Sequence, residues 1–135
     1  MRAQEETLRR LQGIRILVVE DEFLLAMDIE SAIRRAGGEV VGPVVCLEEA
    51  VATAKREELD AAILDLNLRG EMSYPVAEVL DSRRIPFLFA TGYSQSRLPD
   101  AFQSRPCLRK PFTWPALTAA LQRLVAESAG MRNPR

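Results

Sequence analysis

Residues 61–70 read AAILDLNLRG, and they give the most direct indication of the fold class. The apolar run at residues 61–64 is too short for a buried helix, and it ends in an acid, Asp65, before a turn toward Gly70. This pattern predicts a buried strand of a parallel sheet. In open α/β sheets, residues at the carboxyl ends of the strands line the ligand crevice. Asp65 is therefore expected to face a ligand and not the core.

Length and composition indicate one soluble domain. A chain of 135 residues is long enough to bury a single core. The net charge of -1 and the pI near 5.6 give no electrostatic footprint for nucleic acid or an anionic membrane. Because no apolar run reaches the length of a signal peptide or a membrane span, we expect a cytoplasmic protein that binds neither nucleic acid nor membrane.

The counts of histidine, cysteine and lysine limit the kinds of site that the chain can form. The chain has no histidine and two cysteines, Cys46 and Cys107, which excludes the usual zinc sites and histidine acid/base catalysis. The cysteines are expected to be small buried hydrophobic residues. Of the 18 basic residues only Lys55 and Lys110 are lysines. A lysine in a chain that otherwise uses arginine suggests a specific role.

The hydrophobic pattern predicts strands that alternate with helices in one domain over residues 14–126. A short helix or arm is expected at residues 1–13, and a frayed tail at residues 127–135. Strands are expected at residues 14–19, 39–45, 61–65, 85–90 and 106–109, and helices at 23–36, 47–57, 75–82 and 114–125, with at most two weak helical turns at 97–103.

Five strands alternating with helices predict a flavodoxin-like α/β fold with a doubly wound parallel sheet. The common strand order for five strands is 2-1-3-4-5, which places the first and third strands side by side at the topological switch point. Gly42 and Pro43 lie in the second strand and suit an edge position.

Polar residues follow four of the five strands. Glu20 and Asp21 follow the first strand, Asp65 the third, Thr91 the fourth and Lys110 the fifth. Three neighbouring carboxylates repel one another unless a hard cation neutralises them, and oxygen ligands suit Mg²⁺. Thr91 and Lys110 could then stabilise an anionic group attached at Asp65. Each of these residues taken alone could instead be a helix cap, a turn former or a solvated charge.

The absence of two nucleotide-binding motifs limits the ligands that this edge could bind. No glycine-rich loop follows the first strand and no Walker sequence occurs, which argues against dinucleotide and P-loop nucleotide binding. A carboxylate nucleophile beside a metal and a lysine fits phosphoryl transfer onto aspartate.

Four motifs resemble landmarks of the response-regulator receiver domain in order and spacing. They are VVEDE at residues 18–22, LDLNL at 64–68, FATGY at 89–93 and RKPF at 109–112. The stretch PFLFATGY at residues 86–93 resembles, more narrowly, the PFxFATGY subgroup of single-domain bacterial receivers. The resemblance implies that Asp65 accepts a phosphoryl group from a phosphohistidine on a sensor histidine kinase or histidine phosphotransfer protein in a two-component phosphorelay.

The resemblance also implies the ligands of the metal. Asp21, Asp65 and the backbone carbonyl of Asn67 would bind Mg²⁺ directly, and Glu20 would act largely through water. Asn67 and Tyr93 would flank the path of attacking water and set the lifetime of the phosphoryl group.

The remaining roles concern switching. Lys110 would pair with the phosphoryl oxygens, Thr91 would move toward them, and the bond from Lys110 to Pro111 would be cis. Common receivers carry an aromatic switch residue three positions before the lysine, where this chain has Cys107. Tyr93 is expected to take over part of that role.

The expected output is a change in protein contacts by a stand-alone regulator, or removal of phosphoryl groups as a sink, with no reaction on a separate substrate. Two alternatives remain. A haloacid-dehalogenase-like phosphatase would need an acid two residues after the nucleophile, where Asn67 stands. A pseudo-receiver would bind its partner without phosphorylation.

Overall fold

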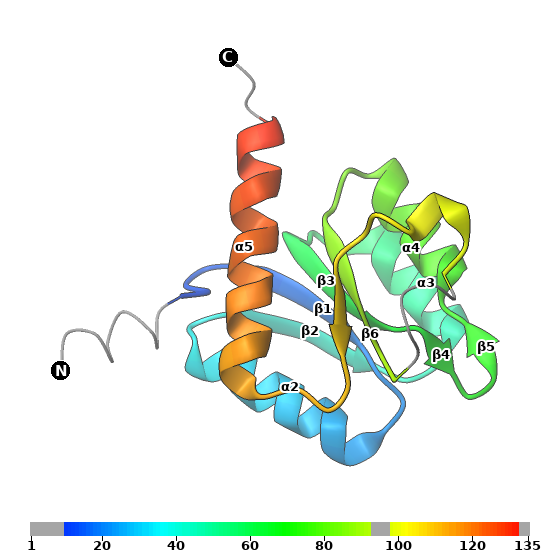
Figure 1. Cartoon of the computed structure of the whole chain (residues 1–135), viewed down its shortest axis with the longest axis horizontal. Coiled ribbons are helices and arrows are strands. Elements are labelled where there is room, and N and C mark those ends of the chain that lie inside the picture. The colour runs from blue at the N-terminus through cyan, green and yellow to red at the C-terminus, as the bar shows by residue number, and fades with distance from the viewer. Residues whose placement is uncertain (1–9, 93–97, 133–135) are drawn as a thin grey trace, which may run out of the picture.

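The computed structural model describes residues 10–92 and 98–132, and its centre is a parallel five-stranded sheet between two helical layers (Figure 1). The order of the strands is β2-β1-β3-β6-β7. This confirms the predicted order 2-1-3-4-5 and the flavodoxin-like fold. The strands are β1 (Arg15–Val19), β2 (Glu39–Val44), β3 (Ala61–Asp65), β6 (Phe87–Thr91) and β7 (Cys107–Arg109).

The helices cover both faces of the sheet. Alternate residues of β1 point to opposite faces. Ile16 and Val18 belong to the core beneath α2 and α5, whereas Leu17 and Val19 belong to the core beneath α3 and α4 (Figure 1). The helices are α2 (Phe23–Arg35), α3 (Leu47–Arg56), α4 (Tyr74–Ser82) and α5 (Trp114–Arg132).

Strand β3 is buried along its whole length because helices cover both faces of the sheet there. It pairs with β1 on one side and with β6 on the other, and Val19 lies beside Leu64 in the β1–β3 register. The residues that follow these two strands therefore meet at one edge of the sheet, which is where Asp65 lies.

A short hairpin follows β3, where the sequence predicted only a turn. Strands β4 (Asn67–Leu68) and β5 (Glu71–Met72) pair antiparallel. The two residues between them, Arg69 and Gly70, have φ angles of 53° and 92°. Positive φ at both central residues is typical of a type I′ turn, which matches the twist of a two-residue hairpin.

One expectation near the C-terminus was wrong. Helix α5 runs to Arg132, beyond the predicted end at residue 125 and into the predicted tail at residues 127–135. The stretch at residues 97–103, where at most two weak helical turns were expected, contains only the short 3-10 helix η2 (Asp100–Phe102) among its described residues. At the other end of the chain, residues 1–9 lie outside the described part, and Leu11 is fully buried against the α2–α5 side of the core.

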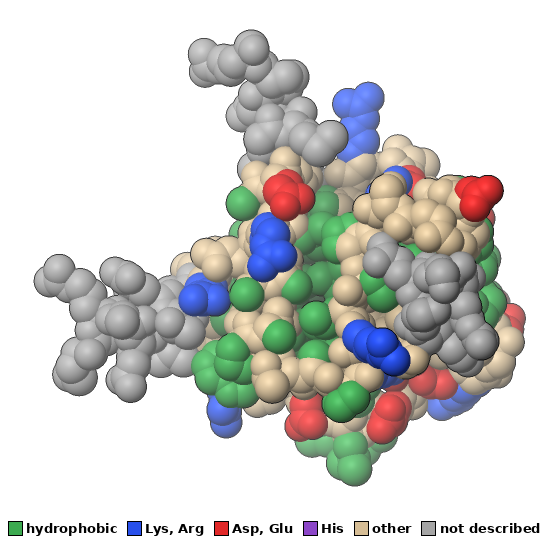
Figure 2. All heavy atoms as spheres, in the orientation of Figure 1, with side chains coloured by type: hydrophobic (Ala, Val, Ile, Leu, Met, Phe, Trp, Pro, Cys, Tyr) green, Lys and Arg blue, Asp and Glu red, His purple; other side chains and the backbone are tan. Residues whose placement is uncertain are grey.

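Acidic and basic side chains are interspersed on the face shown in Figure 2, with no extended area of one sign. Among the helices of the described residues, none is both long enough and apolar enough to cross a membrane.

Candidate functional site

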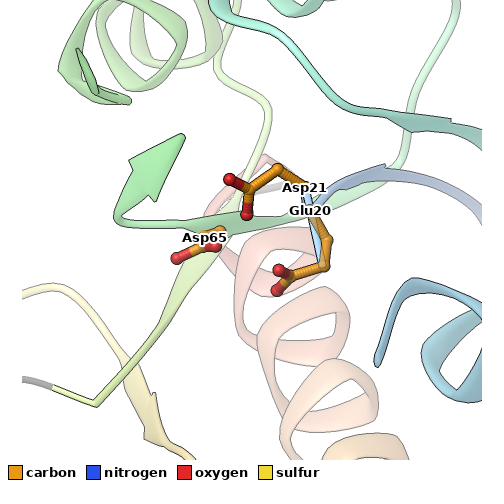
Figure 3. A group of neighbouring side chains, drawn as sticks. All are labelled: Glu20, Asp21 and Asp65. Atoms are coloured by element: carbon orange, nitrogen blue, oxygen red, sulfur yellow. The ribbon is translucent and has the colours of Figure 1, made fainter. Parts of the chain in front are cut away.

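Three carboxylates converge at the carboxyl edge of the sheet (Figure 3). Glu20 and Asp21 follow β1, and Asp65 ends β3. One oxygen from each residue lies within 4.8 Å of the others. Glu20 and Asp65 are only 1% and 7% exposed, whereas Asp21 is half-buried. The structure thus brings together the three acids that the sequence placed at this edge.

Local backbone groups hold the two buried acids. The N–H group of Glu22 donates to Oε2 of Glu20 over 3.0 Å, and the N–H group of Asn67 donates to Oδ1 of Asp65 over 3.3 Å. In both cases the donor lies two residues after the acid. The conformation of the chain just beyond each strand therefore orients the side chain that precedes it.

The third acid is held by a distant part of the chain. The N–H group of Arg69, in the turn between β4 and β5, donates to Oδ2 of Asp21 over 2.9 Å. Sequence reasoning missed Arg69. The usual signal for a two-residue hairpin turn is Asn-Gly or Asp-Gly, and the pair Arg69-Gly70 carries only its second half.

Lys110 supplies the positive charge of the site. Its Nζ atom lies 3.0 Å from Oε1 of Glu20 and 3.4 Å from Oδ2 of Asp65. Burial alone would lower the pKa of the Lys110 ammonium, but Glu20 and Asp65 outweigh that effect, so its pKa is raised. The lysine therefore stays charged over the whole physiological range.

The carboxyl group of Asp65 is strongly perturbed. Its pKa is raised to about 7. Burial is the largest cause and Glu20 adds to the increase, while Lys110 and the N–H group of Asn67 oppose it. One ammonium does not neutralise the three carboxylates around it. The site thus carries excess negative charge that a further cation would relieve.

The donor set fits Mg²⁺. All the side-chain donors are carboxylate oxygens, which a small hard cation prefers, and an incomplete protein shell suits an ion that keeps several waters. The buried Oε1 atom of Glu20 accepts no well-aligned hydrogen bond among the described residues, although Lys110 lies close to it as an ion pair. A metal-bound water could donate to that oxygen.

Of the other predicted site residues, Thr91 and Pro111 lie at this edge. Thr91 is 2% exposed, and its carbonyl oxygen accepts a hydrogen bond from the Lys110 N–H group over 2.9 Å. The bond from Lys110 to Pro111 is cis, as the resemblance implied. Cys107 begins β7 and lies beside Phe89 of β6, and burial raises the pKa of its thiol. Tyr93 lies outside the described residues.

Comparisons with known proteins agree with this geometry. No family model matches the chain. The transcriptional regulatory protein PdtaR of Mycobacterium tuberculosis (strain H37Rv) is 30% identical over 116 residues, which are 83% of this chain and 57% of that protein. The chain therefore spans a little over half the length of this relative.

Two solved structures are similar over almost their whole length. SdrG from Sphingomonas melonis Fr1 is 45% identical, with a TM-score of 0.74 over 86% of this chain and 98% of SdrG. The receiver domain of the sensor histidine kinase PA1611 from Pseudomonas aeruginosa PAO1, solved with magnesium in its active-site cleft, is 28% identical. Its TM-score is 0.73 over 84% of this chain and 98% of that domain. With its fold, its edge of acids and these relatives, the chain belongs to the response-regulator receiver domains.

Proposed function

We propose that Asp65 accepts a phosphoryl group from a phosphohistidine on a sensor histidine kinase or histidine phosphotransfer protein. The observation that carries the proposal is the surroundings of the Asp65 carboxylate. It is a nearly buried carboxylate at a strand end, with Lys110 at 3.4 Å and two further acids within reach of a common cation. These are the groups that phosphoryl transfer onto an aspartate requires.

Asp65, Lys110 and Thr91 have different roles in the transfer. A carboxylate oxygen of Asp65 forms the new bond to phosphorus as the bond from phosphorus to the histidine nitrogen breaks, and that nitrogen leaves with the electron pair. Lys110 stays protonated and offsets charge on the transferred oxygens. Thr91 offers a hydroxyl hydrogen bond from the end of β6, which adjoins β3.

Mg²⁺, when bound, would supply positive charge that stabilises the negative oxygens of the loose transition state. Asp21, Asp65 and the backbone carbonyl of Asn67 would hold it, with Glu20 acting through water. The magnesium in the receiver domain of PA1611 supports this assignment.

The regulator is proposed to act by changing protein contacts or as a phosphoryl sink in the cytoplasm, and to transform no separate substrate. The likeness to SdrG, at 45% identity and a TM-score of 0.74, supports a regulator of the same kind. We assign the chain to the PFxFATGY subgroup on its own residues 86–93. A negative charge added at Asp65 would bias a two-state surface near the site, and so its affinity for a partner.

The phosphatase alternative lacks its acid. The residue two positions after Asp65 is Asn67, and its Oδ1 atom already accepts the Gly70 N–H group over 2.7 Å. A carboxamide held in this way cannot protonate a leaving group. Turnover of a generic phosphoester would restore that alternative, and partner binding that is the same without phosphorylation would favour a pseudo-receiver.

Intact-protein mass spectrometry tests the proposal. The protein is incubated with acetyl phosphate and Mg²⁺, or with a phosphorylated histidine kinase, beside the variants Asp65→Asn and Asp28→Asn. We expect one added phosphoryl group in the unaltered protein and in Asp28→Asn, whose changed side chain is exposed on α2. Asp65→Asn should gain none. A phosphoryl group on Asp65→Asn, or no gain from either donor, would contradict the proposal.

A further inference from the structure

The three acids of the site differ in how they are held. Glu20 and Asp65 each accept an N–H group from two residues further along the chain, whereas Asp21 accepts one from Arg69, 48 residues away. Asp21 is also the most exposed of the three. Its orientation therefore depends on a second element that must be folded in place.

We propose that the turn between β4 and β5 is a positioning element of the metal site, in which the peptide N–H group of Arg69 fixes the Asp21 carboxylate for Mg²⁺. The inference rests on the proposed function, because it concerns the cation of that same site. Groups that orient the ligands of a metal commonly affect metal affinity nearly as much as the ligands do.

The turn between β4 and β5 is held in one backbone conformation. Arg69 adopts φ of 53° and Gly70 adopts φ of 92°. A left-handed conformation is unfavourable for arginine and persists only where the surroundings determine it. The Oδ1 atom of Asn67 accepts the Gly70 N–H group over 2.7 Å, which locks the turn from inside. The strained residue is the one whose N–H group meets Asp21.

The same hairpin serves two proposed ligands of the cation. β4 begins at Asn67, whose backbone carbonyl is one of them, and two residues later Arg69 holds Asp21, which is another. Asn67 also donates its own N–H group to Asp65. Distortion of the turn should therefore loosen the metal site without touching any of its carboxylates.

Gly70 allows a clean test, because a Cβ atom at this position would meet nothing within 4 Å. Gly70→Val therefore strains the backbone of the turn without an immediate clash at Cβ. Gly13→Val is a matched control. Gly13 also has a positive φ, of 76°, and open space around a Cβ atom, but it lies before β1, at the opposite end of the sheet from the acids.

Two measurements on the whole protein test whether the Arg69 N–H group positions Asp21 for Mg²⁺. Titration with MgCl₂ in a calorimeter gives the affinity for the metal alone. Amide hydrogen exchange of the metal-free protein, followed by NMR, reports the Arg69 N–H group directly. Arg69→Pro removes the N–H donor at this position, and because proline cannot adopt the positive φ of Arg69 it distorts the turn as well.

We expect Gly70→Val and Arg69→Pro to bind Mg²⁺ about tenfold more weakly, at the lower end of the effect of such partners. Gly13→Val should bind as the unaltered protein does. The Arg69 amide should be protected in the unaltered protein. Free exchange of that amide, or full Mg²⁺ affinity in Arg69→Pro, would overturn this inference and leave the proposed metal site standing. No Mg²⁺ binding by the unaltered protein would overturn the proposed metal site as well.

Discussion

The Nζ atom of Lys110 lies closer to Oε1 of Glu20, at 3.0 Å, than to Oδ2 of Asp65, at 3.4 Å. Glu20 is 1% exposed, so this ion pair is largely withdrawn from water. Lys110 therefore compensates a buried charge and also faces the phosphoryl acceptor. A phosphoryl group on Asp65 would compete with Glu20 for the same ammonium.

Replacement of Lys110 by methionine should destabilise the metal-free protein. The change leaves Glu20 and Asp65 without their cation, and breaking a partly buried ion pair costs about 1–3 kcal/mol. Urea unfolding at pH 7.5 without Mg²⁺ measures the loss. Lys55→Met makes the same chemical change at an exposed position and should have almost no effect. Equal losses in the two variants would contradict this account of the pair.

The stability of the metal-free protein should fall as the pH rises. Asp65 has a pKa of about 7 in the folded protein against an ordinary value of 3.8. The folded state therefore binds more protons between these values, and the stabilisation present below pH 4 is lost as the pH rises through 7. The loss is at most about 4 kcal/mol. The charged groups that face Asp65 are Glu20, Asp21 and Lys110.

Thermal unfolding between pH 5 and 8.5, with a chelator and at low salt, measures this dependence. Asp65→Asn should flatten the profile and unfold at a higher temperature than the unaltered protein at pH 8. Saturating Mg²⁺ should flatten the profile of the unaltered protein, because the cation offsets the repulsion. A profile that keeps its slope in Asp65→Asn would contradict the assignment of the pKa to Asp65.

The sequence was sufficient for the sheet and for most of the site. Buried strands flanked by helices leave few topologies, and in a parallel sheet the strand ends meet at one edge. The order of the strands and the meeting of Glu20, Asp21 and Asp65 followed from this. Which acid lies nearest to Lys110 depends on side-chain placement that no sequence pattern specifies.

Two features were not predicted, for different reasons. The hairpin between β4 and β5 has strands of two residues each, too short for an alternating pattern, and its turn begins with Arg69 where Asn or Asp is the usual signal. Helix α5 continues to Arg132, beyond the last of the periodic apolar residues that set its predicted end at residue 125.

Phe102 should contribute strongly to stability. Its ring in η2 lies 5.6 Å from that of Tyr74, 5.7 Å from Phe89 and 6.4 Å from Phe87, and the residue is 6% exposed. Phe102→Ala should lower the free energy of unfolding by about 3 kcal/mol. Phe23→Ala, at a residue that is 72% exposed, should change it by less than about 0.5 kcal/mol. Denaturant unfolding compares them, and similar losses would argue against the aromatic cluster.

Cys107 should react slowly with alkylating reagents. Burial raises the pKa of its thiol, so little of the reactive thiolate is present at pH 7.5. In a Cys46→Ser background, iodoacetamide should modify Cys107 several-fold more slowly in the folded protein than in urea. Equal rates in the two states would show that the thiol is not protected.

The most direct test of the central claim identifies the atom that carries the phosphoryl group. The protein is treated with acetyl phosphate and Mg²⁺, reduced with borohydride, which converts an acyl phosphate to an alcohol, and digested with trypsin. Cleavage after arginine separates residues 57–69, with Asp65, from residues 16–34, with Glu20 and Asp21. We predict that fragment spectra of the peptide 57–69 show homoserine at position 65 and intact Asp60. A reduced acid in the peptide 16–34, or a phosphoryl group that survives reduction on a hydroxyl, would contradict the account.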